Sequence, residues 1–466
     1  MTKKEMKHNI WRLAWPAILQ MSFQTSVGVI TMILIGNFLT GAESVAAIGL
    51  SQRIMFLVIG TLVALTVGTT ALVAYNFGAG TKEEAGIILS HSLIIGVGIA
   101  LVLGICLDQF GSFFLTLLML GNPDQGVISM GSGYLSVVGY SMTLGIILMI
   151  INAALQGAGD MKRPMYFTIG MNIMTIILGL ILIPGFSFIP SLGLKGAALA
   201  EGISRGLTSI IAFIMLVRGH LVIKLPAKKN FVWRPGIVKD VLRIGLPSAG
   251  EQFVNHSSHI IYTILIATLG TTAIAANQVI MTVHSISFMP GFGFGVAATT
   301  LVGQSLGARH SDHAEGYGIQ TSKMSAIFMG IMGVVFYIWA RPLVQIFVPD
   351  PEVVGLAAEC LRIVAFAQVP MSIVMVLSGG LRGAGDTRWV MYITMIGQWG
   401  IRLGLSAFAI WYGYGLAGVW MAMMLDMVIR CVLFLFRFRS GQWKTILRKA
   451  KPSLTHQSAK PRGEFS

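Results

Sequence analysis

The chain of 466 residues has few charged side chains, and this scarcity argues against a soluble protein. Only 11% of its residues are Asp, Glu, Lys or Arg, whereas 55% are hydrophobic and the mean hydropathy is +0.77. An ordinary soluble domain carries about 25% charged residues. Five stretches without these four residue types are each longer than the ~20 apolar residues that a membrane-spanning helix needs. They cover residues 13–42, 54–81, 125–159, 164–194 and 252–308.

Cysteine is also scarce, and the three that are present have no paired spacing. Cys106, Cys360 and Cys431 lie in or beside hydrophobic segments, which argues against a disulfide framework or a cysteine-bound metal. The sequence contains no phosphate-binding loop, Ser-His-Asp arrangement or metal-hydrolase signature. We therefore expect a protein that is not an enzyme, has no cofactor or structural metal, and does not use ATP as its energy source.

Acidic residues are outnumbered by basic ones, 18 to 33, which gives a net charge of +15. With the N-terminus inside, 26 of the 33 basic residues fall on one side of the predicted membrane, and only Lys195 and Arg341 fall in loops on the other. Cytoplasmic loops carry such an excess of Lys and Arg. The pattern predicts a multi-pass protein of the cell (inner or plasma) membrane with both termini in the cytoplasm. It favours attraction to anionic lipid over nucleic-acid binding.

Hydrophobic runs predict an all-α integral membrane protein with twelve transmembrane helices. The apolar run after Arg12 is too long for a signal peptide, so we expect it to be retained as the first span. The predicted spans are 13–39, 48–76, 87–107, 127–156, 164–184, 194–217, 244–268, 274–304, 324–340, 356–381, 389–411 and 415–436.

Four short motifs recur in the same order in the two halves of the chain. The spacing between copies changes only from 231 residues, between Pro16 and Pro247, to 222 residues, between Gly193 and Gly415. Because each half has an even number of spans, both enter the membrane in the same direction, as parallel repeats with a substrate pathway between them. The predicted units are a six-helix lobe (1–220), a basic cytoplasmic linker (221–239), a second six-helix lobe (240–440) and a basic cytoplasmic tail (441–466).

The repeated motifs carry a resemblance to a known family. The Gly-Ala-Gly-Asp turns ending at Asp160 and Asp386, the Leu-Pro openings of spans one and seven, and the segment 288–308 resemble the MATE (multidrug and toxic compound extrusion) family, prokaryotic type. The resemblance implies a V-shaped pair of six-helix lobes with a central cavity. It also implies export of cationic or amphipathic compounds by antiport with H⁺ or Na⁺. Three acidic positions of the family are replaced here, by Thr31, Asn255 and Met371.

Glu251 is the candidate for the coupling residue. Glu201, Glu359 and Asp426 each have an arginine three or four residues further on, so we expect structural ion pairs there. Glu251 has no basic residue within the following 57 positions and lies one turn before Asn255. An ionisable group at membrane depth is costly unless it is paired, hydrated or functional. We therefore hypothesise that Glu251 faces the cavity and exchanges a proton, or a Na⁺ bound near it, for an organic cation.

Other polar residues are expected beside Glu251, in stripes on spans one and seven. Such stripes face protein or water rather than lipid, and a helix–helix seam is the alternative to a cavity. Histidines add groups that titrate near neutral pH, with packing as their alternative role. A proline followed by glycine predicts a bend in span eight, either a gate or a static kink. The residues concerned are Gln20, Gln24, Thr31, Asn255, Ser258, Tyr262, His256, His259, His284, Pro290 and Gly291.

Two other functions stay open at this point. A flippase for a lipid-linked precursor would need a strongly cationic cavity, whereas the residues expected in the cavity are polar and acidic. A membrane-embedded lipid enzyme would need a converging catalytic constellation, which the sequence does not suggest. The expected partners are small organic substrates and the lipid bilayer, not nucleic acid, and we expect a monomer.

Overall fold

The computed structural model describes residues 2–38, 42–119, 124–185, 191–226 and 232–449, with the backbone alone at 29, 31–38, 42–45 and 449. Every regular element among these residues is a helix. The helices are α1 (Lys3–Phe38), α2 (Ala42–Gly78), α3 (Lys82–Leu118), α4 (Gln125–Gly157), α5 (Lys162–Leu182), α6 (Gly193–Val217), α7 (Pro235–Ala267), α8 (Thr271–Gly307), α9 (Ser311–Ile338), α10 (Ala340–Gln345), α11 (Pro351–Gly383), α12 (Thr387–Met395), η2 (Ile396–Leu403), α13 (Gly404–Trp411), α14 (Gly415–Arg439), η3 (Gln442–Thr445) and α15 (Ile446–Lys449).

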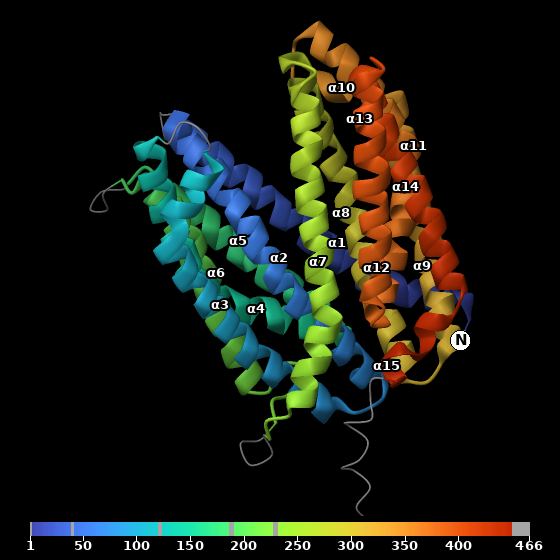
Figure 1. Ribbon diagram of the computed structural model, residues 1–466. Coiled ribbons are helices and arrows are strands. Elements are labelled where there is room, and N and C mark those ends of the chain that lie inside the picture. The colour runs from blue at the N-terminus through green and yellow to red at the C-terminus, as the bar shows by residue number, and fades with distance from the viewer. Residues whose placement is uncertain (1, 39–41, 120–123, 186–190, 227–231, 450–466) are drawn as a thin grey trace, which may run out of the picture.

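The long helices form two lobes of six membrane-crossing helices each (Figure 1). In the second lobe α12, the π-helical segment η2 and α13 form one continuous span, and the short α10 joins α9 to α11. Ten helices in the described part of the chain are long and apolar enough to cross a membrane. The two that complete the predicted twelve are α1 and α7, with 36 and 33 residues, which carry the polar stripes.

The sequence repeat is also a repeat of contacts. In the first lobe the Thr70 hydroxyl on α2 donates a hydrogen bond to the Ala153 carbonyl on α4, at 3.0 Å. In the second lobe the Thr299 hydroxyl on α8 donates to the Gly379 carbonyl on α11, at 2.9 Å. The second and fourth helices of each lobe are therefore joined in the same way, as the predicted parallel repeat requires.

The first helix of each lobe begins against the opposite lobe. Near the start of α1, Asn9 Nδ2 donates to the Tyr317 hydroxyl of α9 at 3.0 Å. At the start of α7, Arg234 forms an ion pair with Glu84 of α3, with Nη1 and Oε1 3.0 Å apart. The lobes therefore interlock at one end of the molecule. In Figure 1 their ribbons meet at this lower end and diverge toward the upper end.

Two glycines at equivalent positions of the repeat allow α2 and α8 to cross closely at this end. A methyl group on Gly78 would collide with the carbonyl oxygen of Gln304, and one on Gly307 would collide with the carbonyl oxygen of Tyr75. The backbones are in contact where the lobes meet, so a side chain at either glycine would force them apart. This requirement explains why the Phe-Gly-Ala and Leu-Gly-Ala segments recur in the sequence.

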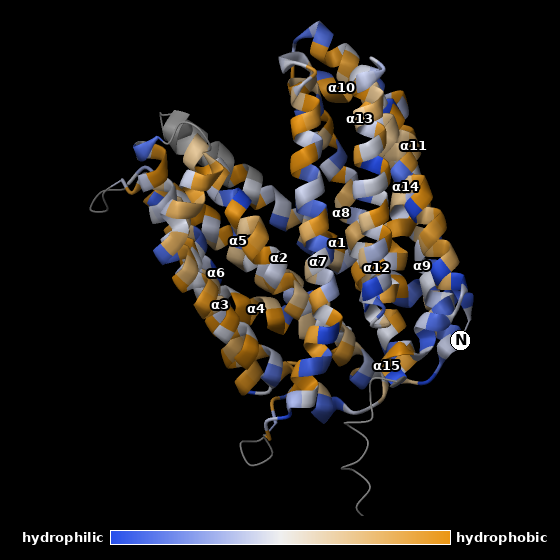
Figure 2. Ribbon diagram, viewed as in Figure 1, coloured by the Kyte–Doolittle hydropathy of each residue, from blue (hydrophilic) through white to orange (hydrophobic). Residues whose placement is uncertain are grey.

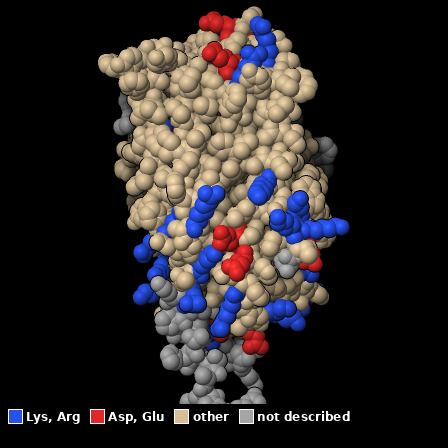
Figure 3. Space-filling model, turned by 90° about the vertical axis from the view of Figure 1, so that its right-hand side faces the viewer, with Lys and Arg blue, Asp and Glu red and all other residues tan. Residues whose placement is uncertain are grey.

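The molecular surface has an apolar belt and one basic end. Large hydrophobic side chains such as Phe113, Ile327 and Phe436 are mostly exposed, and apolar residues cover much of the helices in Figure 2. Lys and Arg gather in the lower part of the face shown in Figure 3, at the end where the N-terminus and α15 lie in Figure 1. A broad apolar surface above a basic end is what a protein embedded in a bilayer requires.

Candidate functional site

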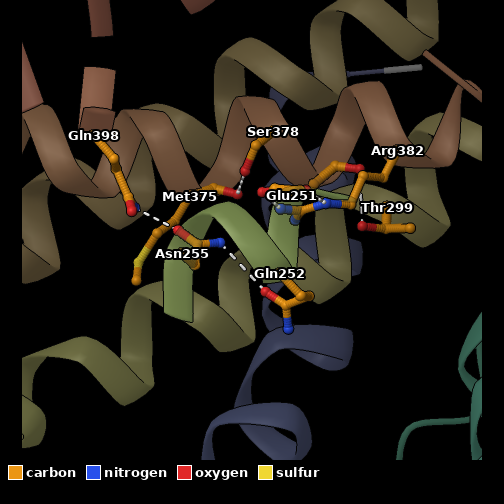
Figure 4. A network of polar contacts seen from close by, with 9 residues as sticks. Glu251, Gln252, Asn255, Thr299, Met375, Ser378, Arg382 and Gln398 are labelled. Atoms are coloured by element: carbon orange, nitrogen blue, oxygen red, sulfur yellow. Dashed lines mark hydrogen bonds and ion pairs between the residues drawn. The ribbon is translucent and has the colours of Figure 1, made fainter. Parts of the chain in front are cut away.

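The Glu251 carboxylate on α7 is paired with Arg382, in the last turn of α11 (Figure 4). Arg382 Nη2 lies 2.5 Å from Glu251 Oε1, and Nε donates to Oε2 at 3.3 Å. The Glu251 side chain is 7% exposed and that of Arg382 is 24% exposed. The prediction of a carboxylate that no arginine neutralises is therefore wrong. The partner comes from another helix, 131 positions further along the chain.

The backbone of α11 beside Arg382 is fixed by two hydroxyl groups. Thr299 of α8 donates to the Gly379 carbonyl, and Ser378 donates to the Met375 carbonyl at 3.1 Å (Figure 4). Both bonds lie within two turns of Arg382. The bond from Thr299 therefore fastens this part of α11 to α8.

The equivalent place in the first lobe contains a neutral pair. Gln20 corresponds to Glu251 through the two Leu-Pro motifs, and Gln156 corresponds to Arg382 through the two Gly-Ala-Gly-Asp turns. Gln156 Nε2 donates to Gln20 Oε1 at 3.3 Å. Both positions therefore differ between the two halves: each is a glutamine in the first lobe, whereas the second lobe has Glu at one and Arg at the other. Positions that change together in this way tend to be in contact. This signal was present in the sequence and was missed.

Asn255, one turn beyond Glu251, belongs to a chain of side-chain amides. Its Nδ2 donates to Gln252 Oε1 at 3.3 Å, and its Oδ1 accepts a hydrogen bond from Gln398 Nε2 (Figure 4). Gln398 lies in η2, and π-helical segments occur frequently at functional sites. The position at which part of the resembled family has a glutamate is thus held by a neutral, hydrogen-bonded amide.

The C-terminal part of the α7 stripe lies inside the second lobe. Tyr262, 2% exposed, and His284 of α8 both meet the indole of Trp420 edge-on, with ring centroids 6.4 Å apart in each case. The Ser258 and Tyr262 hydroxyls and His284 Nε2 are buried and have no hydrogen-bond partner among the described residues. The expectation that these three side chains line the gap between the lobes is wrong, because they are only 1%, 2% and 8% exposed and the rings of Tyr262 and His284 pack against Trp420 of α14.

His256 does face the other lobe. Its ring stacks on Phe56 of α2, with centroids 5.4 Å apart and an angle of 29° between the planes. At the equivalent place of the other seam, the Thr25 hydroxyl on α1 contacts Met289 Sδ on α8 at 3.3 Å. Gln24, next to Thr25, is exposed. His256 therefore marks one of two matching contacts between the lobes.

The predicted bend at Pro290 remains a prediction. Pro290 is buried inside α8, which continues as a helix to Gly307. A methyl group on Gly291 would press on the sulfur atoms of Met329 and Met375, so α8 packs closely at this point. Thr31 lies in the part of α1 where the backbone alone is described, and its side chain is outside the described residues.

Asp426 of α14 is the most deeply buried carboxylate of the second lobe. It is 0% exposed, and it pairs with Arg430 at 2.7 Å and with Arg402 of η2 at 2.9 Å. The ion pairs of Asp426 with Arg430 and of Glu201 with Arg205 confirm two of the three predicted pairs. The third prediction is wrong, because Glu359 and Arg362 form no ion pair in the part of the chain that the structure describes. Arg402 was not predicted as a partner, because it comes from a different span. This network has one more positive charge than negative.

The surroundings of the Glu251 carboxylate do not favour a bound cation. No three His, Cys, Asp or Glu side chains come together as a metal site in the described ranges. The Glu251 carboxylate, near which Na⁺ was expected, already faces a guanidinium. A second cation at that carboxylate would be repelled by Arg382.

Comparison with known proteins agrees with the fold described above. The MatE family model matches residues 16–181 and 247–408. The chain is 28% identical over 450 residues to "Probable multidrug resistance protein NorM" of Thermotoga maritima, covering 94% of each chain. It is 29% identical over 438 residues to "Uncharacterized transporter YisQ" of Bacillus subtilis, covering 93% of this chain and 94% of that one.

A solved structure has the same fold. It is described as the outward-facing conformation of a multidrug resistance MATE family transporter of the MOP superfamily. The TM-score is 0.87 at 22% sequence identity, and the alignment covers 95% of this chain and 97% of the other. The two-lobe architecture of twelve helices is therefore shared with a protein whose sequence is only distantly similar.

Proposed function

Because the chain belongs to the MatE family of membrane transporters, we propose that it exports cationic or amphipathic organic compounds by antiport with protons, and that Glu251 and Arg382 form its coupling site. The observation that carries this proposal is the buried ion pair between them. The name of the Thermotoga maritima relative refers to multidrug resistance, which supports organic compounds as the substrates. The transporter is not an enzyme, and no covalent chemistry is required.

The pair couples proton and substrate through its net charge. With Glu251 ionised, the pair is neutral and its charge-assisted hydrogen bonds hold α7 to α11. Protonation of Glu251 removes one charge, so that Arg382 leaves the site with a net charge of +1. A substrate cation bound ~10 Å away would then lose ~1.5 kcal/mol at an effective dielectric constant of ~20, which is about tenfold in affinity. Proton binding and cation binding therefore oppose each other, as antiport requires.

The number of ligands that each ion needs favours the proton over Na⁺ as the coupling ion. Arg382 opposes the positive charge of either ion, but a proton adds to one carboxylate oxygen and needs no further ligands, whereas Na⁺ needs several oxygen ligands beside the guanidinium. The amide chain through Asn255 and Gln398 provides a neutral polar environment next to the pair.

The basic end of the molecule lies in the cytoplasm in this proposal. The gathering of Lys and Arg there supports that orientation, since cytoplasmic segments carry the excess of basic residues. The lobes then meet at the cytoplasmic side and diverge toward the outside. The protein acts as a monomer in the cell membrane.

The test uses purified protein in liposomes with ethidium as the fluorescent organic cation. We expect an imposed pH gradient to drive ethidium flux, and a Na⁺ gradient alone not to do so. Flux in Glu251→Gln that equals the wild type would refute the coupling site, and flux driven by Na⁺ alone would refute the choice of ion. Movement of labelled lipid between leaflets without ethidium flux would favour the lipid-linked precursor flippase.

A matched variant separates coupling from folding. Glu251→Gln with Arg382→Gln reproduces the neutral pair of the first lobe, Gln20 with Gln156. We expect this double variant to fold and to lose flux driven by the pH gradient. If it keeps that flux, the charge of the pair has no part in transport.

A further inference from the structure

The end where the lobes meet contains a cleft that the proposed exchange at Glu251 does not use. Its volume is about 470 Å³, and it lies between α1, α2, the turn after α4, α8 and α9, so both lobes contribute walls. Small-molecule sites are usually clefts of roughly 300–1,000 Å³. The polar lining residues are Asn9, Arg12, Gln304, Ser305, His310, His313 and Tyr317.

The charge of this cleft is positive. Arg12 and two histidines line it, and no Asp or Glu is among the lining residues. The rings of His310 and His313 stack with centroids 5.1 Å apart. Arg12 has no ion pair in the part of the chain that the structure describes. The cleft therefore offers an arginine and two imidazoles without a carboxylate to neutralise them.

Carboxylates close to the cleft are engaged elsewhere or turned to solvent. Asp160, in the turn after α4, pairs with Arg163 at 3.1 Å, and Glu315 of α9 pairs with Lys444 at 2.5 Å. Asp312 and Glu5 are exposed and are not part of the lining, and the Glu5 carboxylate accepts a hydrogen bond from the Thr2 backbone N–H at 2.8 Å. The cleft also adjoins the start of α9, whose first N–H groups and helix dipole favour an anion.

We propose that this cleft binds a phosphate group, with Arg12 and His313 as its main ligands, and that the bound phosphate holds the two lobes together at this end. An arginine fork matches phosphate oxygens with two parallel hydrogen bonds. The group belongs either to a soluble phosphate compound or to the headgroup of an anionic lipid, which share this chemistry. The locking effect rests on the proposed transport function, whereas the binding site does not.

Binding is measured on the purified full-length protein in detergent. Inorganic phosphate is added at constant pH and ionic strength, with chloride as the replaced anion, and the midpoint of thermal unfolding is followed. We expect a saturable rise for the wild type. Arg12→Gln with His313→Gln should weaken phosphate binding about tenfold or more, because charge-assisted hydrogen bonds are lost. Arg12→Lys keeps the positive charge but loses the two parallel hydrogen bonds of the guanidinium, so this variant should bind phosphate with intermediate affinity.

Arg309→Asn is the matched control. Arg309 is exposed, is not part of the lining, and has a φ of 61°, which asparagine tolerates well. Its phosphate response should equal that of the wild type. An equal loss of response in Arg309→Asn would mean that general surface charge, not the cleft, attracts the anion, and it would overturn the proposal.

Two further measurements identify the source of the phosphate group and the effect of its binding on transport. If phosphatidylglycerol in nanodiscs, compared with phosphatidylcholine, raises the midpoint through Arg12 and His313 while inorganic phosphate does not, the ligand is a lipid headgroup. If neither has an effect that depends on these residues, there is no site. If phosphate binds but leaves ethidium flux unchanged, the binding site stands and only its effect of holding the lobes together is refuted. If the wild type shows no ethidium flux, only the transport proposal is refuted.

Discussion

The first lobe joins Gln20 to Gln156 by a neutral amide hydrogen bond, and the second lobe joins Glu251 to Arg382 by an ion pair at the same place in its fold. Around both pairs the second and fourth helices are joined by the same threonine-to-carbonyl bond. Since two amides are sufficient in the first lobe, the architecture does not require the charges of the second. The charges are therefore a specialisation of one lobe on a shared scaffold.

A second position shows the same difference. Asp426 in α14 pairs with Arg430 and Arg402, whereas its counterpart in α6 is Ser204, followed by Thr208. Both hydroxyls donate to carbonyls of their own helix. Equivalent helices thus pack through small hydroxyl residues in one lobe and through a buried charge network in the other.

The largest effect is expected at Asp426. Asp426→Ala leaves Arg430 and Arg402 without their shared partner in a buried place, and such a loss destabilises by ~3–5 kcal/mol. The control Ser204→Ala removes only a hydroxyl that bonds its own helix and should cost no more than ~1 kcal/mol. Denaturant titration in detergent measures both values. Equal costs for the two variants would remove the difference between the lobes.

The second largest effect is expected at Gly78 and Gly307, two equivalent positions at which the lobes are alike. Gly78→Ala and Gly307→Ala each place a methyl group against a backbone carbonyl of the other lobe, and overpacking of this kind costs ~1–3 kcal/mol. Because the two positions are equivalent, the losses in free energy of unfolding should agree within ~0.5 kcal/mol. Tolerance of one substitution and not the other would mean that the crossing of α2 and α8 is not symmetrical.

A smaller effect on stability, but a large one on transport, is expected at the ion pair. Glu251→Gln leaves Arg382 without its charge partner and should cost ~1–2 kcal/mol, since Arg382 is partly exposed. Adding Arg382→Gln should restore most of that free energy of unfolding without restoring flux driven by the pH gradient. Denaturant titration and the liposome assay are run on the same preparations. If stability and flux recover together, the pair is structural only.

The smallest effect concerns the turn before α12. Burial raises the pKa of Asp386 although its ion pair with Arg437, at 2.8 Å, opposes the shift. The folded state therefore holds this proton more readily than the unfolded chain. The stability that Asp386 contributes is present below pH 3.8 and is lost as the pH rises through its folded pKa.

Asp386→Asn has no such loss, so it should gain in stability relative to the wild type as the pH rises from 3.8. Midpoints of thermal unfolding across this pH range measure the difference. A difference that is constant with pH would contradict the expectation.

The fold followed from the sequence because its signals are local or repeated. Long uncharged runs predicted the spans, and the spacing of Pro16 and Pro247 predicted two matching lobes. Spacings of four residues predicted the ion pairs of Arg205 and Arg430, since such residues lie on one face of a helix. These signals require no knowledge of which helices are neighbours.

The candidate site followed only in part, because its contacts join distant segments. Glu251 was identified, but Arg382 is 131 positions away, and no local pattern reports such a neighbour. Helical spacing put Tyr262 on the polar face of α7 correctly. It did not show that this face turns into the second lobe, since periodicity does not distinguish a wet gap from a seam between helices.

The starts of the two first helices have a consequence for any movement that separates the lobes at this end. Asn9 of α1 contacts Tyr317 of α9, and Arg234 at the start of α7 contacts Glu84 of α3. Each lobe is thus fastened to the other by its own first helix. Separation at this end must therefore break both contacts, one a neutral hydrogen bond and the other an ion pair.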